Sequence, residues 1–180
     1  MRALLIFLIL LSASAYAQSS KLDFKSEVLK LNNQGMAFAG GCSLGNMAYS
    51  GTELVTLSFN DPKNSEAMYR SQMNLAWSGI NTVIFGLAYW GQNKLAKKDD
   101  IDWYKQQKKY QNSFMINTFL DVLYIGGGYW LSQRTKGDLA QNQGFGQAIM
   151  FQGSFLLGYD AIIWYKHYRL RKRSKLPKLD

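Results

Sequence analysis

The stretch DVLYIGGGYW at residues 121–130 decides the fold, because a related stretch, NTVIFGLAYW, occupies residues 81–90. Both stretches begin with Asn or Asp, keep a glycine in the same register and end in Tyr-Trp. A third segment, from Asp160 to Tyr168, follows the layout more loosely. Each leading polar residue lies inside an apolar segment, and the segments recur at near-equal intervals. The repeat therefore predicts a set of similar helices, each with a polar residue near its middle.

Four long segments contain very few charged residues, and they span 34–59, 71–92, 112–133 and 143–165. As a helix rising about 1.5 Å per residue, each would cross a hydrocarbon core about 30 Å thick. Many of the Trp and Tyr residues fall near segment ends, which is typical of helices that meet lipid headgroups. We therefore expect an all-α fold, a four-helix up-down transmembrane bundle with a membrane domain over residues 34–165.

The N-terminus has the three parts of a secretory signal peptide. Arg2 supplies a positive charge, an apolar run follows over residues 4–11, and the small-residue ending Ala15-Tyr16-Ala17 precedes Gln18. The sequence thus predicts a cleaved signal peptide at 1–17 and an N-terminal segment at 18–33. A chain with such a leader is expected in the bacterial cell envelope, at the inner membrane.

Positive charge is concentrated in two regions of a chain whose formal net charge is +9. The lysine-rich stretch 93–111 resembles an amphipathic helix that lies along a surface, and residues 166–180 form a basic C-terminal tail. We expect the tail to contact anionic lipid headgroups and not nucleic acid, which an exported chain does not meet. The expected partners are the lipid bilayer and either a protein partner or a second copy. Four spans would place both basic regions outside, against the usual charge bias, so the orientation stays open.

Five polar residues within the apolar segments are the candidate ligand- or ion-binding residues: Asn46, Glu53, Asn81, Asp121 and Asp160. Ionisable groups at membrane depth are costly, so the two aspartates need partners, water or a proton. In one interpretation, these residues form hydrogen bonds between helices and fix their packing. In another, they line a polar cavity for an ion, a proton or a small ligand. In a third, the bundle is soluble and they are ordinary surface positions.

The glycines of the first and third segments carry two packing expectations. Ala37, Gly41 and Gly45 recur every four residues, so they would form a face on which another backbone approaches closely. The run Gly126-Gly127-Gly128 would loosen or deform the third segment.

We expect no catalytic residue, no metal site and no cofactor. Glu53, Asp121, Asp160 and His167 lack the Glu-x-x-His spacing of bundle metal sites, and a solvated His167 beside the basic tail is expected. Residues 41–45, GCSLG, match the nucleophile pattern G-x-S-x-G, but that motif requires a preceding strand in an α/β sheet. With Cys42 alone, the chain cannot form an internal disulfide.

The leader ending in AYAQ at residues 15–18, the glycine- and aromatic-rich helices and their central Asn or Asp together give a general likeness. In these features the chain resembles small uncharacterised four-helix membrane proteins of the Bacteroidota, a resemblance that implies no activity and no site. We expect a non-enzymatic integral membrane protein, a structural or interaction component of the envelope. The alternative is a small transporter or ligand-binding membrane protein that uses the Asn and Asp residues at mid-depth.

Overall fold

The computed structural model describes residues 2–60 and 65–174, with side chains from Phe24 onward. The described residues form the helices α1 (Arg2–Asn60), α2 (Glu66–Ala96), α3 (Trp103–Ser132) and α4 (Leu139–Arg173). The prediction of an all-α fold with four helices is confirmed.

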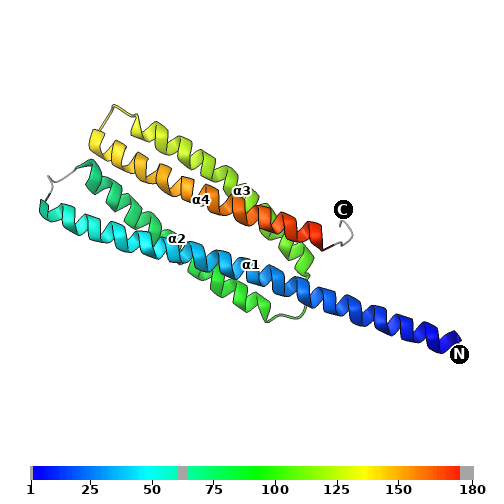
Figure 1. The fold of residues 1–180 in the computed structure, drawn as a ribbon. Coiled ribbons are helices and arrows are strands. Elements are labelled where there is room, and N and C mark those ends of the chain that lie inside the picture. Colours follow the sequence, from blue (N-terminus) through cyan, green and yellow to red (C-terminus); the bar gives the residue numbers. More distant parts are fainter. Residues whose placement is uncertain (1, 61–64, 175–180) are drawn as a thin grey trace.

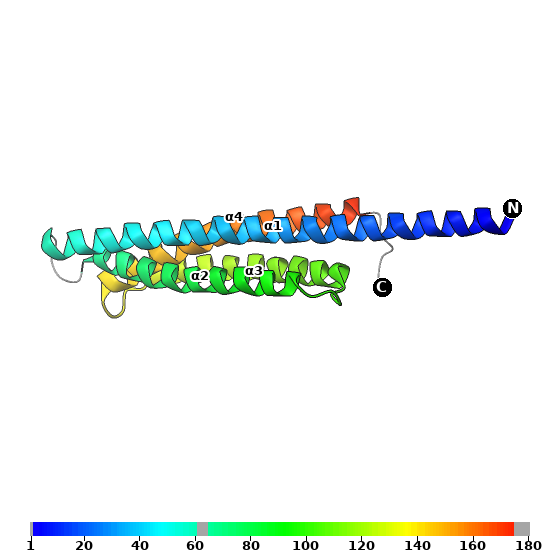
Figure 2. The ribbon, with the colours of Figure 1, turned by 90° about the horizontal axis from the view of Figure 1, so that it is seen from below.

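The helices run alternately up and down, as Figure 1 shows. The helix α1 pairs with α2, α3 pairs with α4, and the two hairpins meet where α2 packs against α4. The long α1 continues past the other helices at the N-terminal end of the molecule (Figure 2). Because α4 contacts both α2 and α3 extensively, it is the central helix of the bundle.

Short polar residues begin three of the helices. Ser65 precedes α2 and accepts a hydrogen bond from the backbone N–H of Met68 at 3.2 Å. Asp102 and Asp138 cap α3 and α4 in the same way, through backbone N–H groups of the first turn. Before α4, Gly137 has a φ of 87°, a left-handed conformation that favours glycine.

Two predicted boundaries differ from the structure. Residues 103–111 are the first nine residues of α3, so the prediction of a separate surface helix over 93–111 is wrong. The start of the predicted tail, from Lys166 to Arg173, is the end of α4. The rest of the predicted tail, residues 175–180, lies outside the described residues.

The prediction of a transmembrane bundle is wrong. Among the residues whose side chains the structure describes, no helix is both long enough and apolar enough to span a bilayer. The low-charge segments are interrupted by uncharged polar residues such as Asn74, Asn117 and Gln152, and the mean hydropathy of the chain is only −0.21. The prediction counted only charged residues and therefore overestimated how apolar these helices are. An amide side chain also opposes burial in hydrocarbon.

Close packing of the helices occurs at glycines other than those predicted. Gly41 and Gly45 have open space where a Cβ would be, so the expected small-residue face does not contact another helix. Instead, Gly128 of α3 lies against Gly146 of α4, and Gly144 of α4 lies against the backbone of Glu66 in α2. These contacts bring α4 close to both neighbours. The three glycines at 126–128 do not interrupt α3, which is continuous.

Candidate functional site

The interior of the bundle is lined largely by polar side chains, and many large apolar side chains are exposed. The sequence repeat explains this arrangement. Its leading residues Asn81, Asp121 and Asp160 are only 7%, 3% and 5% exposed. The apolar residues two positions later, Val83 and Leu123, are 60% and 62% exposed. Each copy of the repeat thus turns its polar residue inward and its apolar residues outward.

Asp121 of α3 and Asp160 of α4 form the central feature of this interior. Their carboxyl groups lie within hydrogen-bonding range of each other, and the Asn117 side chain lies within range of Asp160. Asp121 Oδ2 is buried and has no hydrogen-bond partner among the described residues. Two carboxyl groups this close cannot both ionise at low cost, so one of them must carry a proton.

The pKa values of the pair follow from this geometry. Burial, the nearby charge of Asp121 and the hydrogen bond with it together raise the pKa of Asp160 to about 8, with burial as the largest cause. Burial also raises the pKa of Asp121, while the hydrogen bond with Asp160 opposes that rise. The pair therefore holds one shared proton at neutral pH and exchanges it in the slightly alkaline range.

A second polar group joins α1, α2 and α4. Asn46 donates a hydrogen bond to the Ser78 hydroxyl at 2.6 Å. From α4, the Gln152 amide lies 3.2 Å from Asn74 Oδ1 and 3.5 Å from the Ser78 hydroxyl, and it donates to both. Because Asn74, Ser78 and Gln152 are all buried, these bonds satisfy amide and hydroxyl groups that would otherwise be costly to bury.

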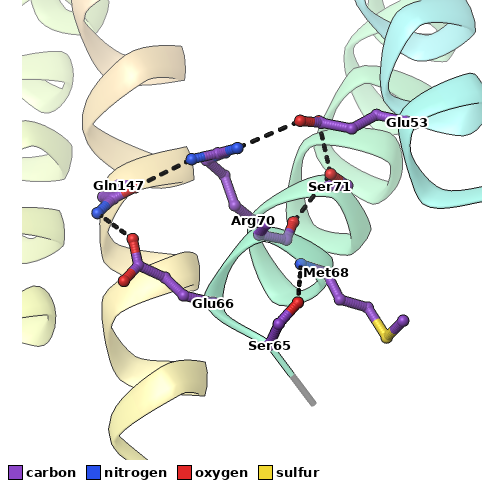
Figure 3. A network of polar contacts seen from close by, with 8 residues as sticks. Glu53, Ser65, Glu66, Met68, Arg70, Ser71 and Gln147 are labelled. Carbon is purple, nitrogen blue, oxygen red and sulfur yellow. Dashed lines mark hydrogen bonds and ion pairs between the residues drawn. The ribbon is translucent and has the colours of Figure 1, made fainter. Parts of the chain in front are cut away.

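A third group, the Glu53 network, surrounds the start of α2 (Figure 3). Glu53 of α1 forms an ion pair with Arg70 at 3.2 Å and accepts a 2.6 Å hydrogen bond from the Ser71 hydroxyl. Arg70 also donates to Gln147 of α4, whose amide donates to Glu66 at 2.5 Å. The network thus connects three helices at the end of the bundle opposite the N-terminus.

His167 is fully buried, so the expectation of a solvated histidine is wrong. Its Nε2 lies 2.9 Å from Asn32 Oδ1 and donates to it, while Gln107 donates to its backbone oxygen at 2.9 Å. The ring stacks on Phe114, with centroids 5.7 Å apart. Burial lowers the pKa of His167 to about 4 because it disfavours the charged imidazolium. Its Nδ1 has no hydrogen-bond partner among the described residues.

The five predicted site residues therefore do not form one site. Asp121 and Asp160 lie together, whereas Asn46 belongs to the group around Ser78 and Glu53 to the network with Arg70. Across the part of the chain that the structure describes, no group of three or more His, Cys, Asp or Glu side chains could hold a metal ion. Ser43 is buried within helix α1, without the strand that a nucleophile elbow requires.

Two interior features have little signal in the sequence. His167 and Asn32 are 135 positions apart, and no local sequence pattern predicts their contact. Arg70 immediately precedes a charge-free segment, a position typical of a surface residue, although its guanidinium contacts side chains of two other helices. The spacing of polar residues on one face of α2 could have indicated Ser78, which lies four residues after Asn74.

A comparison with family models gives one match. A model described as a family of unknown function (DUF6992) matches residues 39–161, more than half of the chain. The match is consistent with an uncharacterised family and shows neither a bacterial group nor a membrane location. No curated protein and no solved structure matches the chain. The matched region contains the carboxyl pair, the Ser78 group and the Glu53 network, and the chain belongs to the DUF6992 family of unknown function.

Proposed function

We propose that this protein is a non-enzymatic interaction component that works as part of a protein assembly. The observation that supports this function is the outward face of the sequence repeat. Trp90 and Trp130, which end the two best copies, are 64% and 65% exposed, and Val83 and Leu123 are exposed to a similar degree. Exposed apolar surface of this extent is typical of an interface that another molecule covers.

A second copy of this chain is the partner that the repeat favours. Two helices, α2 and α3, present the same series of outward residues, so a self-complementary contact can form between like surfaces. Several polar side chains of the interior, such as Asn46, Gln152 and Glu53, are paired with neighbouring polar side chains. The predicted leader at residues 1–17 supports a location in the bacterial cell envelope.

Site-specific photo-crosslinking in cells tests this function. A photoreactive amino acid replaces Leu87 of α2 or Leu123 of α3, both 62% exposed. The matched control replaces Lys109, an exposed polar position of α3. We expect a crosslinked band at the mass of two chains from both apolar positions and little from Lys109. Absence of protein adducts at both leucines would contradict an interaction role, and adducts to other proteins would exclude the second copy as partner.

A second candidate function, proton or small-ligand binding at Asp121 and Asp160, has one observation in its favour. Asp121 Oδ2 is buried and has no hydrogen-bond partner in the described part of the chain, and burial raises the pKa of both carboxyl groups. Substituting Asp160→Asn keeps the size of the side chain and removes the exchangeable proton. If this candidate is correct, the infrared band of a protonated carboxyl group disappears near pH 8 in the native chain and is absent from Asp160→Asn.

A further inference from the structure

We propose that the groove between α1 and α4 binds a single-chain anionic amphiphile, a long acyl chain that ends in a carboxylate. This inference is independent of the assembly proposed above. The groove has a volume of about 780 Å³ and lies near the N-terminal half of α1 and the end of α4. Its volume falls within the range of small-molecule sites.

The positions of the lining residues follow from two contacts between the helices. Asn32 is hydrogen-bonded to His167, and Gly35 lies against Ile163. Because α1 and α4 run in opposite directions, these contacts place the groove residues from 31 to 34 opposite the middle of its α4 wall, and those at 27–30 opposite its end. The two ends of the groove therefore have different chemistry.

One end of the groove is apolar. Leu31 of α1 and Ala161 and Ile162 of α4 form its walls. Ile162 is 57% exposed. An acyl chain that covered it would remove this apolar surface from water, which is favourable. More apolar than polar surface lines the groove as a whole, as expected for a site that takes a hydrocarbon chain.

The other end of the groove is basic. Lys166, Arg169 and Arg173 are spaced along one face of α4, and Lys30 faces them from α1. Glu27 is the single carboxylate in the lining, so four cations face one anion. Arginine side chains bind carboxylates through two parallel hydrogen bonds. The carboxylate head of the ligand would lie at Arg169 and Arg173 while its acyl chain covers Leu31 and Ile162.

A second hollow continues the basic end. It has a volume of about 520 Å³ and shares Arg169 and Arg173 with the groove, and it adds Tyr168 and Lys172. The Arg169 guanidinium lies 6.0 Å from the centroid of the Tyr165 ring, which holds it along this wall. No Asp or Glu occurs in α4 between residues 161 and 173, so no acid of this helix segment neutralises these cations. They are therefore available to attract an anion.

Photoaffinity labelling of the purified full chain with a photoreactive palmitate tests the inference. We expect saturable labelling that excess palmitate removes and inorganic phosphate does not, with the label in peptides that contain residues 30–34 and 161–173. The photoreactive alcohol of the same chain length has no charge and should label about tenfold less well, since a charge-assisted bond is lost.

Two pairs of variants assign the label to the groove. Arg169→Gln/Arg173→Gln should raise the palmitate concentration for half-labelling about tenfold, and Lys108→Gln/Lys109→Gln, two exposed cations of α3, should leave it unchanged. Ile162→Ser should weaken labelling and Ile116→Ser should not, because both isoleucines are 57% exposed and Ile116 lies outside the groove.

Three outcomes would overturn the inference. The first is equal labelling by the acid and the alcohol, which would show that the cations do not contribute. The second is labelling that Arg169→Gln/Arg173→Gln leaves unchanged. The third is a label spread over the exposed apolar residues of α2 and α3, such as Leu123, which would mean that the probe partitions onto any apolar surface.

Discussion

Gly128 of α3 and Gly146 of α4 lie very close together. The backbone oxygen of each one occupies the space that a side chain at the other position would fill. A Cβ added at Gly128 would lie 2.8 Å from the oxygen of Gly146, and one added at Gly146 would lie 2.5 Å from the oxygen of Gly128. These neighbours are backbone atoms, which cannot rotate away as a side chain can. The contact therefore fixes how closely α3 approaches α4, and with it the distance between Asp121 and Asp160.

Substituting Gly146→Ala should lower the free energy of unfolding by about 1–3 kcal/mol, because the added methyl group must push two helices apart. Gly126→Ala is the matched control, since a Cβ there meets open space. Alanine also favours a helix over glycine, so this control should be neutral or more stable by up to about 1 kcal/mol. Denaturant unfolding followed by circular dichroism measures both. Equal effects of the two substitutions would contradict the close contact.

The carboxyl pair predicts how stability changes with pH. Burial raises the pKa of Asp160 from 3.8 to about 8, so the folded chain holds a proton that the unfolded chain has released. This contribution to stability is complete below the unfolded pKa and is lost as the pH rises through the folded value. His167 acts in the opposite direction, because burial lowers its pKa from 6.5 to about 4. Its contribution is complete above the unfolded pKa and is lost as the pH falls toward 4.

We therefore expect the two contributions to oppose each other between about pH 4 and 6.5, and stability to fall from about pH 6.5 to 8 at a limit of about 1.4 kcal/mol per pH unit. In Asp160→Asn the fall above pH 6.5 should disappear and the rise due to His167 should remain. Asp99→Asn, at an exposed position in the loop before α3, is the control. Urea unfolding at intervals of pH gives the curves. A native curve that does not fall above pH 6.5 would contradict the shared proton.

The repeat in the sequence predicted the helices and their inward polar residues because both depend on local spacing. Asp121 lies in a low-charge helix, and the matching stretch around Asn81 indicates that both residues occupy equivalent positions within their own helices. Whether the helices are apolar enough to lie in lipid could not be predicted from this local spacing. Counting charges treated Asn117 and Gln152 as compatible with lipid, whereas the described helices are too polar to span it.

The partners of the polar residues depend on how one helix is shifted along another, which spacing within a helix does not specify. Asn46 and Glu53 share a helix face in the sequence, yet one contacts Ser78 and the other Arg70. His167 lies between Lys166 and Tyr168 at the start of a basic run, so its neighbours in the sequence indicated a solvated tail. Its burial comes from α1 and α3, which contribute Asn32 and Gln107.

Substituting Asn32→Ala should destabilise the chain by about 1–3 kcal/mol, because the His167 Nε2 proton loses its acceptor inside the bundle. The neighbouring Asn33→Ala is the control, since its amide makes a long contact of 3.5 Å with Asn93 at a partly buried position. We also expect the pKa of His167 in Asn32→Ala, measured by nuclear magnetic resonance, to stay below 6.5, because burial is the cause of its shift. A larger loss of stability in Asn33→Ala would be inconsistent with this arrangement.

Glu53 has two partners that differ in exposure, and salt should distinguish them. Ser71 is fully buried and bonds Glu53 at 2.6 Å, whereas the side chain of Arg70 is 37% exposed in its 3.2 Å ion pair. Ser71→Ala should therefore cost about 1.5–3 kcal/mol at any salt concentration, since it removes a hydrogen bond to a charged group.

Arg70→Met keeps the length of the side chain and removes its charge. We expect it to cost about 0.2–1 kcal/mol at low salt, because the ion pair is partly solvated. In about 1 M NaCl screening should remove most of this cost, while the cost of Ser71→Ala should stay the same. Unfolding of the native chain and both variants at two salt concentrations provides the comparison. If the Ser71→Ala effect also vanished in salt, the Ser71 hydroxyl would not be bonded to Glu53, and Glu53 would connect α1 to α2 through screened charge alone.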